Sequence, residues 1–371
     1  MPTLATTVNG IKLPNPFVIG SGPPGTNANV CGKAFDEGWG AVIIKTISLD
    51  ASKVVNVAPR YARLRTEGSR EIIGWQNIEL ISDRPFSVWI DELRMLKDKY
   101  PDGVVIASVM EEYNKDRWIE MIERVQATGV AGFELNFSCP HGLPERKMGA
   151  AMGQDGAIMN EVCGWVMGAA KVPVWAKLTP NVTSVAAGAE AALKAGCQGV
   201  SLINTILCVM GVDLDTLRPE PTVEGYTVPG GYSCIAVKPI ALRMVKECAE
   251  TIRDKFPGRS LSGIGGIESG TDAAQFILLG ADTVQVCTGV MKNGYGCIRA
   301  MKDQLQAFMA RHGFENIDQF KGHSLQYFST HADLVRRQAE AKAAKVKQVV
   351  TRDGEWQAGE FVRQSDSLAR G

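Results

Sequence analysis

Lysine and asparagine side chains stand where short apolar runs of this chain end. Lys45 closes the run GAVIIK and Lys177 closes VPVWAK, while Asn136 and Asn204 end two further runs. An ammonium group held at such a place can stabilise an anion that develops during a reaction. A carboxamide carries a donor and an acceptor side by side, so it matches the C=O and N–H edge of a pyrimidine or hydantoin ring. Each residue alone also fits a solvated strand end or a turn, but two lysines in the same topological place favour a binding site.

Cys139 follows Asn136 in Asn-Phe-Ser-Cys-Pro-His, ahead of a glycine-rich stretch that contains Gly142, Gly149 and Gly153. A thiol with a pKa of about 8.5 on such a loop can act as a general acid, a general base or a nucleophile. The chain has nine cysteines, an odd number, and no CxxC pair. We expect the other eight to be buried and reduced, with no disulfide framework, no metal site and no cysteine-ligated iron–sulfur cluster.

Two glycine-rich turns follow later apolar runs, GIGG at 263–266 and CTG at 287–289. Backbone N–H groups at such turns commonly bind a phosphate, so we expect a phosphorylated cofactor. The sequence GSGPPG at 20–25 matches the dinucleotide fingerprint GxGxxG, but its adjacent prolines suit a Rossmann helix poorly. We therefore expect no NAD-binding domain.

These residues must be positioned by alternating strands and helices. Apolar runs typical of buried strands lie at 16–20, 40–45, 103–109, 131–137, 172–178, 199–204, 260–263 and 281–287. Helical periodicity lies between them, at about 84–99, 118–125, 157–170, 183–195, 235–255, 270–279 and 294–312. Eight such units predict an α/β fold, a (β/α)8 TIM barrel with its catalytic groups at the carboxyl ends of the strands.

Two long stretches, 46–83 and 206–233, interrupt the repeat and predict lids or small sheets beside the site. Asn77 and Glu79 in the first of them are further site candidates. After about residue 321 the composition changes to a basic amphipathic helix at 331–350 and a turn at Asp353-Gly354 between extended pieces. We expect a catalytic barrel over 1–321 and a tail of helix plus extended segment over 322–371.

Forty basic and forty acidic side chains cancel, so no global field favours nucleic acid or an anionic membrane. The chain shows no basic and apolar leader and no run of about 18 apolar residues. We expect a cytoplasmic protein, or a plastid protein if a transit peptide has been removed.

Taken together, the motifs resemble the flavin mononucleotide (FMN) barrel of dihydropyrimidine dehydrogenases, and more broadly the dihydroorotate dehydrogenases. The resemblance covers roughly residues 4–310 and is carried by NPFVIGSGPP, AVIIKTISLD, QNIELIS, VIASVMEEYNK, ELNFSCPHG, GQD, AKLTPNVT, INT, GGI and VCTG. The tail is similar to that of the short, FMN-only plant-type forms, which lack iron–sulfur and NAD-binding domains.

The resemblance implies a role for each matching residue. FMN would lie against Ser21, Lys45, Thr46, Asn77, Asn136, Lys177, Ser233 and Cys234, with its phosphate held by Gly265, Gly266, Cys287 and Thr288. A pyrimidine would contact Asn77, Glu79, Asn136, Ser138, Asn204 and Thr205. Cys139, Lys177 and Ser138 would form the catalytic group, with Cys139 as the proton donor.

Two positions depart from the family pattern. Cys234 follows Gly230-Gly231-Tyr232-Ser233 where the family usually has glycine, which is expected to perturb flavin packing. Met152 stands where the large enzymes carry a second cysteine, in what we expect to be a loop.

The implied reaction is reduction of the 5,6 double bond of uracil or thymine, the first step of pyrimidine catabolism. FMN N5 would deliver hydride to C6 while Cys139 protonates C5. Electrons would come from NAD(P)H, directly or through a separate reductase subunit, in a homodimer or higher homo-oligomer. No nucleic acid or membrane partner is expected.

Other functions remain open on the sequence alone. A dihydroorotate dehydrogenase would run the same half-reaction oxidatively, although Glu79 would repel the orotate carboxylate. A reductase of another cyclic imide or hydantoin, or a non-catalytic subunit that awaits a reductase, also fits. From a different class, a flavin-free aldolase would form a Schiff base at Lys177.

Overall fold

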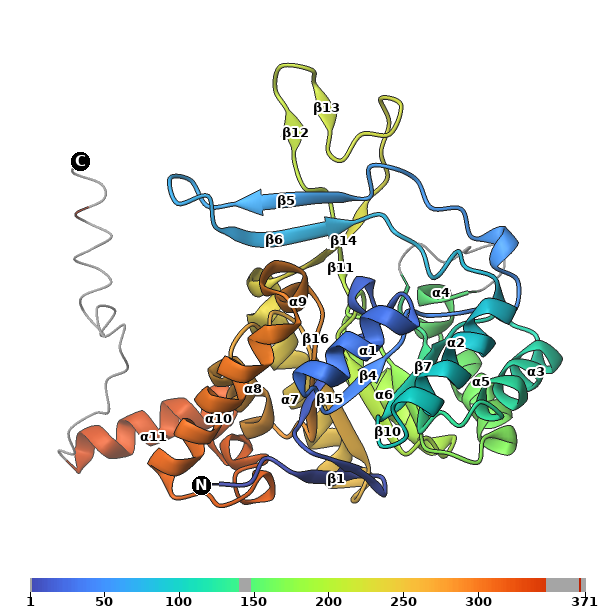
Figure 1. Cartoon of the computed structure of the whole chain (residues 1–371). Helices are drawn as coiled ribbons and strands as arrows, with labels where there is room; N and C mark the ends of the chain where they lie inside the picture. The colour runs from blue at the N-terminus through green and yellow to red at the C-terminus, as the bar shows by residue number, and fades with distance from the viewer. Residues whose placement is uncertain (1, 140–147, 345–366, 368–371) are drawn as a thin grey trace. The chain divides into compact units, whose positions relative to one another are not determined.

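The structure, a computed structural model, describes residues 2–139, 148–344 and 367. Eight parallel strands close into one barrel, which confirms the expected TIM barrel. In barrel order the strands are β3 (Phe17–Ile19), β4 (Ala41–Ile43), β7 (Val105–Val109), β8 (Gly132–Asn136), β9 (Val174–Lys177), β10 (Gly199–Leu202), β15 (Ser260–Ile264) and β16 (Thr283–Val286). Figure 1 shows the helices wrapped around this barrel.

The register of the barrel strands places functional side chains next to one another. Asn136 at the end of β8 pairs with Lys177 at the end of β9. Lys177 in turn pairs with Ser201 in β10. Because carboxyl ends of parallel strands meet at one edge, the side chains that the sequence places at those ends converge on one mouth.

The outer helices agree with the expected periodicity to within a few residues. They are α2 (Phe86–Lys99), α3 (Lys115–Gln126), α5 (Gly156–Ala169), α6 (Val185–Lys194), α7 (Lys238–Lys255), α8 (Gly270–Leu278) and α10 (Ile298–His312). The short helices α4 (Ala150–Gly153) and α9 (Thr288–Asn293) were not expected from the sequence. In α3, Trp118, Met121, Ile122 and Val125 are buried, as their spacing predicts. Met152 lies in α4 rather than in the expected loop.

A longer helix, α1 (Ala28–Glu37), was also not among those that periodicity identified. The side chain of Asn27 caps it by accepting a hydrogen bond from Val30 N. Gly32 in its middle weakens the helical signal in the sequence. This glycine is required by packing, because a Cβ there would lie 2.8 Å from the Tyr100 hydroxyl.

Both long interruptions fold into one small antiparallel sheet, as expected. Its order is β11 (Ile206–Cys208), β14 (Gly230–Ser233), β6 (Ile72–Asn77) and β5 (Tyr61–Arg65), so the two insertions meet in the middle. Figure 1 shows this sheet at the top of the barrel, with the β12 (Val212–Asp213) and β13 (Arg218–Pro219) hairpin projecting beyond it.

The opposite end of the barrel is closed by the hairpin of β1 (Thr6–Val8) and β2 (Ile11–Leu13). Val8 and Leu13 pack against Val18, Ile43 and Trp175 in an apolar cluster. The barrel therefore has an apolar floor and one open mouth.

The chain divides into two compact units, residues 1–325 and 326–371. Within the second unit, α11 (His331–Ala343) is capped by Thr330, and it accounts for the first part of the expected tail helix. The rest of that helix and the expected turn at 353–354 lie outside the described residues. No helix among the described residues is both long and apolar enough to span a membrane.

Candidate active site

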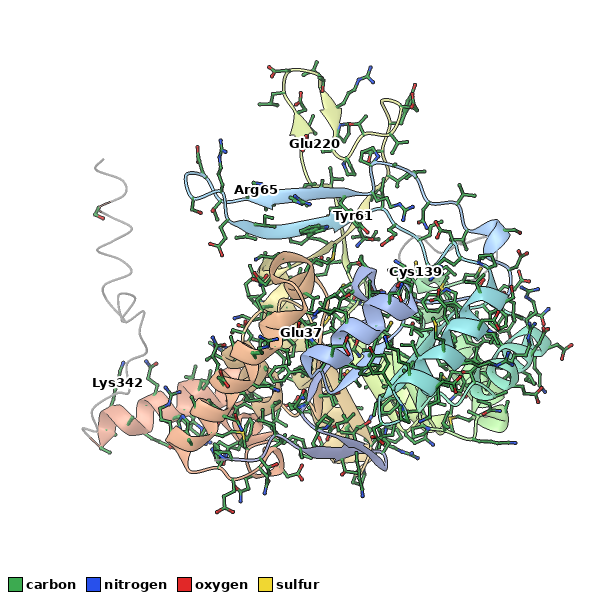
Figure 2. All side chains as sticks on the ribbon, in the orientation of Figure 1. Glu37, Tyr61, Arg65, Cys139, Glu220 and Lys342 are labelled. Carbon is green, nitrogen blue, oxygen red and sulfur yellow. The ribbon has the colours of Figure 1, made fainter. Side chains whose placement is uncertain are left out.

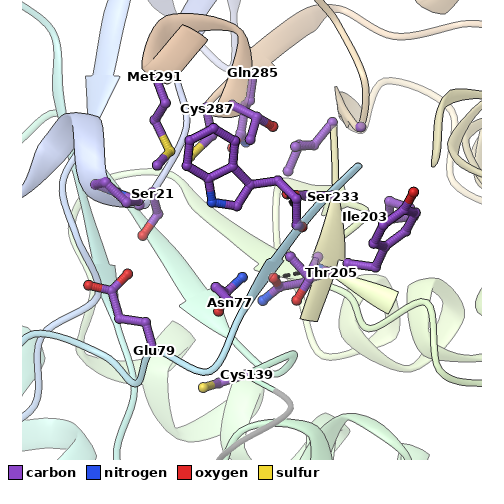
Figure 3. A pocket seen from close by; sticks show the side chains of 18 of the residues that line it. Ser21, Asn77, Glu79, Cys139, Ile203, Thr205, Ser233, Gln285, Cys287 and Met291 are labelled. Carbon is purple, nitrogen blue, oxygen red and sulfur yellow. Dashed lines mark hydrogen bonds between the residues drawn. The ribbon is translucent and has the colours of Figure 1, made fainter. Parts of the chain in front are cut away.

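A cavity of about 1060 Å³, counted with the space open to solvent, lies between the barrel mouth and the small sheet. Figure 3 shows Ser21, Asn77, Glu79 and Cys139 around this hollow, and Figure 2 shows Cys139 at the end of the barrel that carries the sheet with Tyr61. Most of the predicted site residues line it, namely Ser21, Lys45, Thr46, Asn77, Glu79, Asn136, Cys139, Lys177, Asn204, Thr205, Ser233, Gly265, Gly266, Cys287 and Thr288.

One face of the small sheet forms the roof of this cavity. Asn77 pairs with Tyr61 and with Gly231, and its Nδ2 donates to the Gly231 carbonyl at 3.2 Å. Trp75, two residues earlier on the same face, is 5% exposed, and its indole Nε1 has no hydrogen-bond partner among the described residues. The Arg63 guanidinium lies over the Trp75 ring at 4.4 Å.

Sequence reasoning identified Asn77 but missed Tyr61 and Trp75. The signal was available, since Trp75 and Asn77 are two residues apart and alternate residues of a strand share a face. What the sequence did not show is that this face turns toward the barrel.

Hydrogen bonds connect hydroxyl and amide groups on the barrel side of the cavity, opposite the small sheet. Asn136 Nδ2 donates to Thr46 Oγ1 at 2.9 Å, and Thr46 also lies 3.2 Å from Ser21 Oγ and 2.8 Å from Ser108 Oγ. The other side of the Asn136 amide, Oδ1, accepts from the backbone and hydroxyl of Ser138. Both ends of the amide are thus engaged, so its orientation is determined.

Ser138 extends these hydrogen bonds to the end of β10, because Asn204 Nδ2 donates to its hydroxyl at 2.8 Å. Ser138 itself is fully buried and does not line the cavity. The prediction that Ser138 contacts substrate is therefore not supported in this arrangement. Ser138 instead orients the amides of Asn136 and Asn204, which do line the cavity.

The carboxylate of Glu79 is surrounded by donors. Lys45 Nζ lies 2.9 Å from Oε2, and Arg60 donates to Oε1 at 3.1 Å. The Tyr61 hydroxyl also donates to Oε2 at 3.0 Å. Burial, with the Glu79 charge second, raises the pKa of Tyr61, so this phenol stays a donor. Glu79 thus lines the cavity with its charge compensated, and Arg60 is a neighbour that the sequence did not reveal.

The second lysine, Lys177, is 5% exposed and lies inside the barrel mouth. Its Nζ is 3.4 Å from Oε1 of Glu134, a carboxylate deeper in the barrel. Both predicted ammonium groups therefore face the cavity, Lys45 paired with a carboxylate that lines it and Lys177 paired with a carboxylate behind it.

Cys139 is the last described residue before the gap at 140–147, and its thiol is 6% exposed. It packs with Ile81, Met110 and Met148. Its carbonyl accepts a hydrogen bond from Ala150 N, at the start of α4, at 3.1 Å. Gly142 of the predicted glycine-rich stretch lies outside the described residues.

The glycine turn after β15 has the backbone shape that a phosphate site needs. Gly265 and Gly266 have φ values of 132° and 71°, and a Cβ on Gly266 would lie 2.9 Å from the Cys234 carbonyl. Only glycine fits such a place, so the backbone N–H groups stay accessible. Thr288, at the start of α9, lies on the same side of the cavity.

Cys287 brings a second thiol to the cavity, and a Cβ on Gly22 would lie 2.6 Å from its sulfur. Burial raises the pKa of this thiol to about 11, although Lys177 and Lys45 act in the opposite direction. Cys287 is therefore a neutral thiol at neutral pH.

Cys234 does not line the cavity, contrary to the expected contact with FMN. Its φ of 83° is a conformation that favours glycine, which agrees with the glycine expected here from the family pattern. The thiol is turned to the Glu268 carboxylate, at 3.3 Å, and burial raises its pKa to about 11. The side chain is thus accommodated behind the cavity rather than in it.

No group of three or more histidine, cysteine or acidic side chains in the described part of the chain is arranged to hold a metal ion. The donors of the cavity are ammonium, amide, hydroxyl and backbone N–H groups. Such a set suits an organic anion with a phosphate and ring carbonyls.

Comparison with known proteins agrees with this geometry. The family described as dihydroorotate dehydrogenase matches residues 3–309. The chain is 59% identical to a dihydropyrimidine dehydrogenase (NADP(+)), chloroplastic, of Arabidopsis thaliana, over 99% of this chain and 88% of that protein. It is 40% identical to the NAD-dependent dihydropyrimidine dehydrogenase subunit PreA of Escherichia coli K12, over 86% of this chain and 76% of that one. A dihydroorotate dehydrogenase B (NAD(+)) catalytic subunit of Thermoplasma volcanium is 31% identical over 87% of this chain and 98% of its own length.

Proposed function

Because the chain belongs to the dihydroorotate dehydrogenase family, we propose that it is an FMN-dependent oxidoreductase that reduces the 5,6 double bond of uracil or thymine. The observation that supports this most directly is the convergence of Lys45, Lys177, Asn136, Asn204 and Cys139 on one cavity. Two ammonium groups, two amides and a thiol are the groups that a flavin, a pyrimidine and a proton transfer require.

The cavity fits FMN on three observations. Gly265 and Gly266 line the cavity in a turn packed so closely against the chain behind it that a Cβ would collide there, and the backbone of such a glycine turn suits a phosphate. The buried indole N–H of Trp75 has no partner among the described residues and would suit an acceptor on a ring. Lys45 and Lys177 would lie beside the ring carbonyls, where negative charge develops on reduction.

Bound FMN would supply the hydride chemistry. The residues of this chain would do the rest: Asn77, Asn136, Asn204 and Thr205 would bind the alternating edge of the pyrimidine ring. The Cys139 thiol would then donate its proton to C5 of that ring. Its exposure of only 6% keeps water from competing for this step.

The geometry disfavours the alternatives that the sequence left open. A Schiff-base aldolase is disfavoured because the matching family and the named relatives are dehydrogenases. A dihydroorotate dehydrogenase needs a cation for the orotate carboxylate, whereas Lys45 and Arg60 are already paired with Glu79. The identity of 59% to a dihydropyrimidine dehydrogenase also favours the pyrimidine reductase.

The test is a comparison of ring substrates on the purified, FMN-loaded protein. We expect kcat/KM for uracil or thymine to exceed that for orotate by at least about 10²-fold, because an unpaired buried carboxylate costs several kcal/mol. A protein that takes up no FMN, or that prefers orotate, would contradict the proposal. Hydantoin and other cyclic imides serve as the third arm.

For the electron source, we propose NAD(P)H as the ultimate donor, directly or through a reductase subunit, and no iron–sulfur cluster in this chain. The names of the relatives support both routes, since one name includes NADP(+) and another describes a subunit. Anaerobic titration of the bound flavin with NADPH and NADH separates the two routes, because reduction of the flavin in the purified chain alone requires the direct route.

The cytoplasm or a plastid is the proposed compartment, and a homo-oligomer the proposed assembly.

A further inference from the structure

Glu134 is a buried carboxylate inside the barrel, directly behind the cavity. It lies in β8, two residues before Asn136, and is 1% exposed. Ser201 Oγ donates to its Oε2 at 2.7 Å, and Gln285 Nε2 donates to the same oxygen at 2.8 Å. Within the described part of the chain its one ion pair is with Lys177, at 3.4 Å from Oε1.

The barrel does not need a charge at this place. Interiors of such barrels are ordinarily filled by branched apolar side chains, and the layer below is apolar here too, with Val18, Ile43 and Trp175. A buried carboxylate costs several kcal/mol of desolvation, and replacing a buried ion pair by apolar residues is often neutral or stabilising. Fold stability alone therefore gives no reason for Glu134.

Hydrogen bonds from neighbouring strands fix the position of the Glu134 carboxylate. Gln285 bridges two layers, because its Nε2 lies 2.8 Å from Glu134 and 3.2 Å from Ser262 Oγ, which in turn accepts from Thr283 at 2.8 Å. Gln285 also lines the active-site cavity, whereas Glu134 does not. Glu134 therefore reaches the cavity only through Lys177 and Gln285.

We propose that Glu134 is a positioning residue that offsets the positive charge which Lys177 presents to the bound flavin. This inference rests on the proposed FMN site. An ammonium group backed by a carboxylate stabilises negative charge on the flavin less than an isolated ammonium group does. The reduced flavin is then less stabilised, which makes it a stronger hydride donor toward the poorly electrophilic ring of uracil.

The two lysines of the cavity differ in how far a carboxylate compensates their charge. Glu79, the partner of Lys45, is shared with Arg60, and so its charge is divided between two cations. Glu134 is shared with no second cation among the described residues. Lys177 is therefore the lysine whose charge is more fully compensated, and Glu134 is the residue to change.

The test is Glu134→Gln, which removes the charge and keeps the size. The variant should fold, because an amide oxygen can still face Lys177 while the new NH2 group takes the place of Oε2. A flip of the Gln285 amide then presents its Oε1, which has no partner among the described residues, to that NH2 group, and the Ser201 hydroxyl rotates to accept from it. We expect the equilibrium constant for reduction of bound FMN, measured against a reference dye, to rise at least tenfold. By the two-electron relation this is an upward shift of about 30 mV in midpoint potential.

Glu111→Gln is the matched control. Glu111 is also 1% exposed and ion-paired, with Arg117 at 3.0 Å, but it does not line the cavity and pairs with neither of its lysines. Its variant should leave the equilibrium constant within about twofold of the unaltered protein. An equal shift in both variants would show a general effect of buried charge loss and would overturn the proposal.

Two further variants keep the proposal testable if Glu134→Gln is poorly folded. Ser201→Ala removes one donor to the carboxylate and leaves its charge more effective against Lys177, so the equilibrium constant should fall at least twofold. When Glu134→Gln is added to Lys177→Met, the equilibrium constant should not rise tenfold over that of Lys177→Met alone, because Glu134 acts through the ammonium group. An unchanged potential in Ser201→Ala and Glu134→Gln, in proteins that hold FMN, would overturn the inference. Failure of the unaltered protein to bind FMN would instead overturn the proposed function.

Discussion

Two thiols line the cavity, and their surroundings assign them different roles. Cys139 follows β8 and comes directly after Ser138. The Ser138 hydroxyl joins the amides of Asn136 and Asn204 by hydrogen bonds. Cys287 stands at the start of α9, on the side of the glycine cradle. A proton donor to the substrate ring must lie near the groups that bind that ring, so the position of Cys139 favours it as the general acid.

Replacement of the proposed proton donor tests this assignment. We expect Cys139→Ala to keep FMN bound but to lower kcat by about 10²- to 10⁴-fold, the usual contribution of a general acid. Steady-state kinetics with uracil and the visible spectrum of the bound flavin are the measurements. Cys297→Ala, a thiol outside the cavity, serves as the control and should keep full turnover. Normal turnover in Cys139→Ala would remove the thiol from the mechanism.

At the scale of elements, the turn between β15 and α8 determines the phosphate cradle. The strand ends at Ile264, and the chain then passes through two left-handed glycines before Ile267 returns to the core. Ala241 in α7 approaches so closely that a Cβ on Gly265 would lie 2.6 Å from its Cβ. The cradle is therefore made jointly by a turn and by the helix packed against it.

Gly266→Ala tests the cradle. Its φ of 71° and the 2.9 Å approach of the Cys234 carbonyl leave no room for a methyl group, so the backbone must shift. We expect the FMN dissociation constant, measured by quenching of flavin fluorescence, to rise at least about tenfold, equivalent to about 1.4 kcal/mol.

Gly258→Ala is the matched control for this variant. Gly258 has a φ of 86° as well, but a Cβ there would meet nothing within 4 Å. Both variants carry the strain of a left-handed alanine, about 1–2 kcal/mol, and only Gly266→Ala also crowds the chain packed behind the cradle, which must displace the cradle backbone. Equal loss of FMN affinity in the two would show that backbone strain, and not the cradle, is responsible.

For the whole molecule, thiols whose pKa is raised by burial make the free energy of unfolding depend on pH in the alkaline range. Burial raises the pKa of Cys234, Cys287 and Cys297 from 9.0 to about 11 and that of Cys31 to about 12. Thiols in the unfolded chain lose their protons near pH 9 while those in the folded chain keep them. Stability is therefore fully present below pH 9 and is lost as pH rises toward 11.

Urea unfolding between pH 8 and 11 measures this loss. We expect the free energy of unfolding to fall by on the order of a few kcal/mol over the range, discounted for the partly accessible Cys287 and Cys297. Cys297→Ala should reduce the slope above pH 9, because it removes one of the shifted groups. A free energy that stays constant from pH 9 to 11 would contradict the link.

The barrel could be predicted from the sequence because each of its strands is a short apolar run that carries its own signal. Each predicted strand is found within about three residues of its expected bounds, and Lys45, Lys177, Asn136 and Asn204 come together because parallel strands end at one mouth. The family resemblance supplied the roles of the loop residues Asn77 and Cys139. Helix α1 was missed because glycine, which packing against Tyr100 requires, weakens helical periodicity.

What the sequence alone determined is thus the fold, the family and the set of chemical groups at the strand ends, since these depend on local patterns. Only the tertiary structure decided which charges oppose one another. Glu134 pairs with Lys177, Glu79 with Arg60, and Trp75 turns its face to the cavity, although these partners are distant in the sequence or belong to different elements. Such contacts depend on side-chain direction and barrel register, and no periodicity in the chain encodes them.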